Sequence, residues 1–183
     1  MHRDGDRVLV WQAHSDPLAD EGVRDQRFAG PRWLGTRTTG LRLSLPALLA
    51  RTRWGQEPGR ERTLGVWIPV EALRRYLHQG VLDERDDALY GGVRGRRLAT
   101  RWAQVLVRWE EEVDLQGRPT GAQTPRIGLR QQALRGFVEA DVLAIDDWTE
   151  RVRAGARAVA ERLPPRELLQ LPADTLQRIT GGA

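Results

Sequence analysis

The chain has 183 residues, of which 29 are basic and 25 acidic, and a formal net charge of +4. It contains no cysteine, which excludes disulfides, thiolate catalysis, iron–sulfur clusters and zinc–thiolate sites. Every basic residue is an arginine, so neither Schiff-base chemistry nor a phosphate-binding P-loop lysine is available. The three histidines are scattered along the sequence, and we expect no metal site.

The use of arginine alone does not identify a partner. A high-GC coding bias produces the same composition, and the small net charge argues against a strongly cationic surface. No apolar run approaches the roughly 20 residues needed to span a bilayer, and the N-terminal apolar run is too short for a signal peptide. We therefore expect a cytoplasmic protein that does not enter a membrane.

The first half of the chain alternates between strand-like and helix-like segments. Short runs rich in β-branched and aromatic residues are typical of buried strands, and apolar residues at helical spacing predict helices. The expected elements are, in chain order, a strand over 7–13, a helix over 16–27, a loop over 28–40, a helix over 44–53, a loop over 54–62, a strand over 63–68 and a helix over 70–79.

The second half is more polar and its pattern is less regular. Residues 81–101 are rich in Asp, Arg and Gly and are expected to be an excursion with limited order. The elements expected after them are a strand over 103–109, a loop over 110–123, a helix over 130–139, a strand over 141–145 and a long surface helix over 149–163.

This irregular interleaving predicts an α+β fold with a mixed sheet flanked by helices. We expect one ligand-binding or catalytic domain over residues 1–165, followed by a loosely attached helical tail over residues 166–183. Trp11, Trp67 and Trp109 lie on predicted strands and are expected to be buried.

The stretch from residue 30 to residue 61 combines arginines with tryptophans on predicted loops and helix ends. A guanidinium group binds phosphate through two parallel hydrogen bonds, and an indole ring stacks on a base or on nicotinamide. The pattern therefore predicts a phosphate or nucleotide site; the alternative is that arginine stems cover apolar surface around core tryptophans. The residues concerned are Arg32, Trp33, Arg37, Arg42, Arg51, Arg53 and Trp54.

Polar side chains also follow the predicted strands. Gln12 and His14 lie at the end of the first strand, and ligands often bind beside strand ends in sheet-containing folds. Asp146 and Asp147 end the fourth strand, where carboxylates can act in acid–base steps. The alternatives are a structural histidine and solvated acidic turns.

Several segments resemble the motifs of the bacterial family called domain of unknown function 4291. That family has a YQAYRP-like strand end, an RF-G-G element, a motif close to KPNFLWMMYRSGW, an L-W-D-P strand, an LGLRG element and an acidic strand close to IEDIT. In the same order, the corresponding segments here are WQAHS at 11–15, QRFAG at 26–30, RLSLPALLARTRW at 42–54, VRWE at 107–110, IGLR at 127–130 and IDDWT at 145–149. Ser15 replaces the arginine of the first motif, and of the KPNF stretch only a basic Arg42 remains.

The layout of these segments is also similar to that of the ADP-ribosyltransferases, which split NAD and transfer ADP-ribose. This resemblance implies that Arg37, Arg42 and Arg51 hold the pyrophosphate of NAD and that His14 contacts the nicotinamide ribose beside Gln12. Trp54 is then the ring that stacks on nicotinamide. Asp146 has the role of stabilising the oxocarbenium-like transition state.

Two functions are therefore expected. The first is a nucleotide-using transferase, an NAD-dependent enzyme similar to ADP-ribosyltransferases, with an arginine-rich phosphate site and NAD as its cofactor. The alternative is a non-catalytic module that binds nucleic acid or another phosphorylated ligand through the same arginines. Binding to a nucleic-acid surface weakens steeply with salt, which separates it from binding in a nucleotide pocket.

Overall fold

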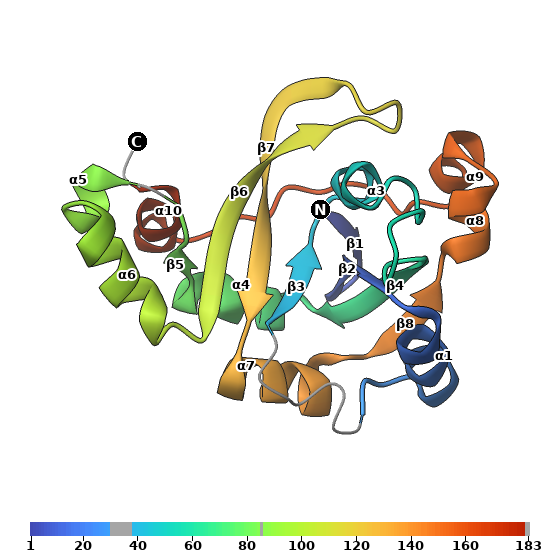
Figure 1. The fold of residues 1–183 in the computed structure, drawn as a ribbon, viewed down its shortest axis with the longest axis horizontal. Coiled ribbons are helices and arrows are strands. Elements are labelled where there is room, and N and C mark those ends of the chain that lie inside the picture. The colour runs from blue at the N-terminus through green and yellow to red at the C-terminus, as the bar shows by residue number, and fades with distance from the viewer. Residues whose placement is uncertain (30–37, 85, 182–183) are drawn as a thin grey trace.

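A computed structural model describes residues 1–29, 38–84 and 86–181, and its most regular part is a mixed β-sheet covered by helices (Figure 1). The described strands form one eight-stranded sheet in the order β5-β6-β7-β3-β2-β4-β8, and β1 pairs with β2. The strands are β1 (His2–Asp4), β2 (Arg7–His14), β3 (Thr39–Arg42), β4 (Arg62–Pro69), β5 (Val81–Leu82), β6 (Val105–Val113), β7 (Pro119–Leu129) and β8 (Ala144–Asp147).

The centre of the sheet is β2, whose residues Val8–Trp11 are fully buried. Strand β4 pairs with it along its whole length, from Arg7↔Pro69 to His14↔Arg62. All pairings are antiparallel except that of β5 with β6. The run of β-branched and aromatic residues in β2 suits this position, because both faces of the strand are covered.

Helices pack on both faces of the sheet. The larger core cluster joins one face to α1, α4, α7, η1 and α10, and the smaller cluster joins the other face to α3, α8 and α9. The helices are α1 (Asp16–Asp25), α3 (Leu45–Thr52), α4 (Val70–Gln79), α5 (Asp87–Tyr90), α6 (Val93–Arg101), α7 (Gln131–Gly136), the π-helix η1 (Phe137–Asp141), α8 (Thr149–Arg153), α9 (Ala156–Ala160) and α10 (Ala173–Thr180).

The predicted fold class is confirmed, since the chain forms a single α+β domain with a mixed sheet flanked by helices. Helix α4 has the predicted bounds, and β2, β4 and α3 differ from prediction by a residue or two at their ends. Trp11 and Trp67 are buried, and Trp109 is partly buried.

The predicted loops in the second half are wrong. Residues 110–123 continue β6 to Val113 and begin β7, which together form a long hairpin that projects beyond the sheet (Figure 1). Three glutamates follow Trp109, and a run of acidic residues favours an exposed loop over a strand. Two of them are, however, paired with arginines, Glu110 with Arg42 and Glu112 with Arg166. Neutralised charges of this kind are compatible with a strand.

Residues 81–84 and 86–101 are also more ordered than expected. They contain β5, α5 and α6, although none of the residues of α6 is buried. The long helix expected over residues 149–163 is instead two short helices, because Gly155 has a φ of 97° and breaks the helical path between α8 and α9.

The expectation of a loosely attached C-terminal segment is wrong, because this segment packs into the core. Its helix α10 contributes Ile179, which is fully buried in the larger core cluster, and the indole Nε1 of Trp109 donates to the Ile179 carbonyl at 2.6 Å. Arg166 forms an isolated bridge with His2 of β1. The predicted domain boundary at residue 165 stays a prediction.

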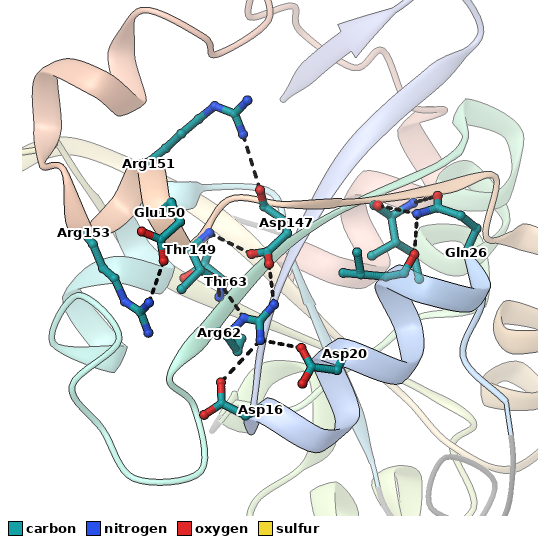
Figure 2. Close-up of polar contacts among 12 residues, drawn as sticks. Asp16, Asp20, Gln26, Arg62, Thr63, Asp147, Thr149, Glu150, Arg151 and Arg153 are labelled. Atoms are coloured by element: carbon teal, nitrogen blue, oxygen red, sulfur yellow. Dashed lines mark hydrogen bonds and ion pairs between the residues drawn. The ribbon is translucent and has the colours of Figure 1, made fainter.

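Arg62 connects its own strand, β4, with β8, α1 and α8 near the β8 end of the sheet. Figure 2 shows the guanidinium group of Arg62 donating to Asp147 at the end of β8, to Asp20 of α1 at 2.6 Å and to the hydroxyl of Thr149 at 3.2 Å. Burial alone would raise the pKa of Asp147, but hydrogen bonds from Thr149 and Arg62 outweigh it and the pKa lies below its ordinary value. Burial alone would lower the pKa of Arg62, but hydrogen bonds to Asp147, Asp20 and Asp16 raise it above its ordinary value.

No helix of the described residues is long and apolar enough to cross a bilayer.

Candidate functional site

The sheet has a gap near its centre. Strands β2 and β3 pair at a single position, Trp11↔Arg42, and do not pair beyond it toward His14 and Thr39. A cleft of about 130 Å³ lies between the two separated strand ends. We call it the strand-gap cleft, and its lining residues are Gln12, Ala13, His14, Thr38, Thr39, Gly40, Arg42, Leu48, Thr52, Arg60 and Arg126.

Two buried polar atoms of the cleft lining are left without a hydrogen-bond partner. Gln12 and Thr39 are each 2% exposed, and neither Gln12 Nε2 nor Thr39 Oγ1 has a partner among the described residues. The other end of the Gln12 amide is held, because Gln12 Oε1 lies 2.8 Å from Nε2 of His14. An unsatisfied buried donor or acceptor costs about 1–3 kcal/mol, so these atoms favour a polar ligand or water in the cleft.

Arginines from three neighbouring strands lie side by side at this cleft. Arg42 of β3 is directly opposite Arg126 of β7, which is directly opposite Arg108 of β6. Residues opposite one another project from the same face of a sheet, and like charges in that arrangement are destabilising. We call Arg42, Arg126 and Arg108 the arginine row.

Carboxylates compensate only part of this charge. Glu110 accepts two hydrogen bonds from Arg42, at 3.0 and 3.2 Å, and lies 3.9 Å from Arg126. Asp83 pairs with Arg108 at 2.9 Å. Burial, together with the charges of Arg42, Arg108 and Arg51, lowers the pKa of Arg126 in spite of Glu110. Three guanidinium groups thus lie beside two carboxylates, which leaves an excess of positive charge that an anion could neutralise.

A second cavity of about 230 Å³ continues from the cleft along the same face of the sheet. It shares Thr38 and Arg126 with the strand-gap cleft, and Asp83 and Arg108 form its far side. Arg126 thus lines both cavities, whereas Arg42 lines only the strand-gap cleft and Arg108 only the second cavity.

Three of the predicted site residues, Gln12, His14 and Arg42, line the cleft, although Gln12 and His14 project from one face of the sheet and Arg42, opposite Trp11, projects from the other. Arg37, like Arg32 and Trp33, lies outside the described residues. Arg51 is exposed on the last turn of α3 and does not line the cleft, although its charge acts on Arg126.

Two predicted site residues lie elsewhere. Trp54 is partly buried against the smaller core cluster and lines a separate small cavity with Pro46, Ala50 and residues of the β6–β7 turn. Asp146 accepts a hydrogen bond from Trp67 Nε1 at 2.8 Å. Trp67 and Asp146 lie on one face of the sheet, and Arg62, the residue directly opposite His14, lies on the other. His14 and Asp146 therefore project from opposite faces of the sheet, because side chains alternate along a strand.

Sequence reasoning missed Arg108 and Arg126. Both lie in strands, and a strand over 119–129 was not expected, so the facing of the three arginines could not be inferred. A usable signal was present: each arginine stands between apolar residues, in VLVRW and TPRIGL, where an exposed-loop interpretation is not favoured.

Among residues 1–29, 38–84 and 86–181, no group of three or more His, Asp or Glu side chains is placed to hold a metal ion. Comparison with the curated proteins gave no match to the chain. A family model described as Domain of unknown function (DUF4291) matches residues 1–175 of the 183. The order of the quoted motifs and this nearly complete match agree, and the chain belongs to the DUF4291 family.

Proposed function

We propose that the strand-gap cleft and the arginine row bind the phosphate groups of a nucleotide, with NAD as the first candidate. The observation that carries the proposal is that Arg42, Arg126 and Arg108 lie opposite one another on three strands, a repulsion that Glu110 and Asp83 offset in part and that a bound anion would offset further. Guanidinium groups are well suited to this role, because they bind phosphate oxygens through two hydrogen bonds.

The shape of the site favours a small molecule over a nucleic-acid strand. The arginine row lines two neighbouring cavities, which share Thr38 and Arg126, rather than a flat surface. The free donor of Gln12 and the hydroxyl of Thr39 can bind the polar groups of a base, a ribose or a carboxamide in the cleft. The two cavities then accommodate different parts of one ligand.

A transfer of ADP-ribose from bound NAD is the reaction that the resemblance implies, with NAD supplying the activated ribose. His14, held by Gln12, is on the cleft and can orient the ligand. Asp146 projects from the same face of the sheet as Arg42 but lies three strands away and lines neither cavity, so in this proposal the carboxylate nearest the ligand is Glu110, which Arg42 keeps in place. Binding is therefore better supported by the geometry than transfer.

The test is a calorimetric titration of the protein with NAD, ADP-ribose and ADP at low and at moderate salt. Saturable one-to-one binding that depends weakly on salt is expected. Arg126→Gln should weaken binding by about 2–4 kcal/mol, as the loss of one partner of a water-excluded charge pair does. The matched control is Arg157→Gln, which removes the same charge from an exposed position on α9.

The outcomes separate the candidate functions. Equal affinities for Arg126→Gln and Arg157→Gln, or no binding of any of the three compounds, would overturn the proposal. Release of nicotinamide that requires Arg126 would add cleavage of the bond between nicotinamide and ribose, and recovery of ADP-ribose bonded to an acceptor other than water would add the transfer reaction. Steep loss of nucleotide affinity with salt, together with oligonucleotide binding that Arg126→Gln weakens, would favour the non-catalytic nucleic-acid module at this site instead.

A further inference from the structure

Helix α6 is anchored to the molecule along one side only. It lies with α5 at the outer end of the sheet, beyond β5 (Figure 1), and none of its residues is buried. Gly95 is the closest contact with α5: a Cβ atom there would lie 1.8 Å from the carbonyl oxygen of Tyr90. The hydroxyl of Tyr90 donates to the Leu82 carbonyl at 2.6 Å, and Arg96 pairs with Asp83 at 3.2 Å.

The opposite side of α6 carries arginines without acidic partners. Arg94, Arg97 and Arg101 follow one another at helical spacing, so they lie along one stripe, and all three are exposed. Within the described chain none of the three forms an ion pair, whereas Arg96 on the same helix does. The unpaired charge is thus concentrated on the side of α6 opposite to Gly95 and Arg96.

A groove of about 580 Å³ lies beside this stripe. Arg130, at the start of α7, forms its other wall and donates to the Thr100 carbonyl at 3.4 Å, while its Nε atom is buried without a partner among the described residues. We call this the α6 groove, and its lining residues are Arg94, Arg97, Leu98, Thr100, Arg101 and Arg130.

An exposed indole ring stands at the end of the stripe. Trp102 is 71% exposed, and the guanidinium carbon of Arg101 lies 5.0 Å from the centre of its ring. Tryptophan is usually much more buried than this in a folded protein. A stripe of arginines that ends in an exposed aromatic ring is the combination that binds the backbone and bases of single strands.

We propose that the α6 groove binds single-stranded nucleic acid, with Arg94, Arg97 and Arg101 contacting successive phosphates and Trp102 stacking on a base. Charge complementarity selects a polyanion, because four arginines and a single leucine line the groove. An anionic bilayer is less well matched, since an interfacial helix needs a continuous apolar face and α6 has only Val93, Leu98 and Ala99 among its nine residues. This surface is separate from the strand-gap cleft and does not depend on the nucleotide proposal.

The experiment measures binding of a fluorescent oligothymidylate of about 12 nucleotides by anisotropy, over salt concentrations from about 50 to about 200 mM. The triple variant Arg94→Gln/Arg97→Gln/Arg101→Gln should bind more weakly and reduce the slope of log K against log salt by about 2, since each phosphate contact contributes about 0.7. Trp102→Ala should weaken binding by about 5- to 150-fold, and Trp102→Phe should restore most of it.

Two controls keep the outcomes distinct. Arg151→Gln/Arg153→Gln/Arg157→Gln removes the same charge from exposed positions on α8 and α9, and Arg126→Gln removes it from the strand-gap cleft. Both should keep the wild-type slope. No binding by the wild type, equal losses in the two triple variants, or binding to phosphatidylserine vesicles but not to the oligonucleotide would each overturn the proposal.

Discussion

Arg126 has an arginine directly opposite it on both neighbouring strands. Replacing it with threonine, a residue suited to strands, removes this repulsion, so the ligand-free protein should become more stable by about 0.2–1 kcal/mol. Ligand affinity should fall at the same time. Urea denaturation with and without NAD measures both effects. Lower stability of Arg126→Thr without ligand would mean that the pairing with Glu110 outweighs the repulsion and that the row needs no anion.

Arg51 allows a second residue-scale prediction. Its side chain is exposed, and the last turn of α3 is capped by the backbone N–H of Arg53, which points to the carbonyls of Ala50 and Leu49. Arg51→Ala should therefore change the unfolding free energy by no more than about 0.5 kcal/mol. Its charge acts on Arg126 without lining the cleft, so ligand affinity should fall modestly and the loss should shrink as salt rises. A lowered melting temperature with unchanged affinity would make Arg51 structural.

At the scale of the elements, β2, β4, α1, α3 and α4 could be predicted from the sequence, whereas β1 was not expected and β3 begins inside the loop expected over residues 28–40. The apolar runs of β2 and β4 and the proline-initiated α3 are local signals, and local signals survive in the fold. The β6–β7 hairpin was not predictable, because its acidic residues are neutralised by arginines distant in sequence. For the same reason only part of the candidate site could be predicted. Gln12, His14 and Arg42 lie in or next to segments with a clear sequence pattern, whereas Arg108 and Arg126 become neighbours only because the hairpin forms.

The break between α8 and α9 gives a prediction for an element. Gly155 has a φ of 97° and a ψ of −177°, a conformation that is essentially restricted to glycine. Gly155→Ala should destabilise the protein by about 1–3 kcal/mol. The matched control is Gly136→Ala, because Gly136 is helical, with a φ of −58° and open space at its Cβ position, and should stabilise by about 0.4–1 kcal/mol. Thermal melts of the two variants should shift in opposite directions; a shift of both in the same direction would contradict this assignment.

At the scale of the whole molecule, the contacts of Arg62 with Asp20, Asp147 and Thr149 connect α1, β4, β8 and α8 (Figure 2). The pKa of Asp147 is lower in the folded protein than in the unfolded chain, so its contribution to stability is present above the ordinary carboxyl value of 3.8 and is lost as the pH falls below it. Asp147→Asn should cost about 1.5–3 kcal/mol at neutral pH and progressively less in acid.

Urea denaturation at pH 7, 4 and 3 checks this prediction. Asp6→Asn, which removes an exposed carboxylate from the turn after β1, is the control and should track the wild type. A difference between Asp147→Asn and the wild type that stays constant down to pH 3 would show that the carboxylate acts through packing rather than through its charge.

The gap between β2 and β3 gives the sheet an edge in its interior. Backbone amides and carbonyls of residues 12–14 and 39–40 lie in the middle of the strand order, yet none of the described strands pairs with them across the gap. Amide protons held by a ladder exchange slowly with solvent and those of an open edge exchange quickly, so some central residues should behave like peripheral ones. Exchange at these positions then reports occupancy of the cleft directly: a ligand that bridges the two edges should slow it there before it alters the rest of the molecule.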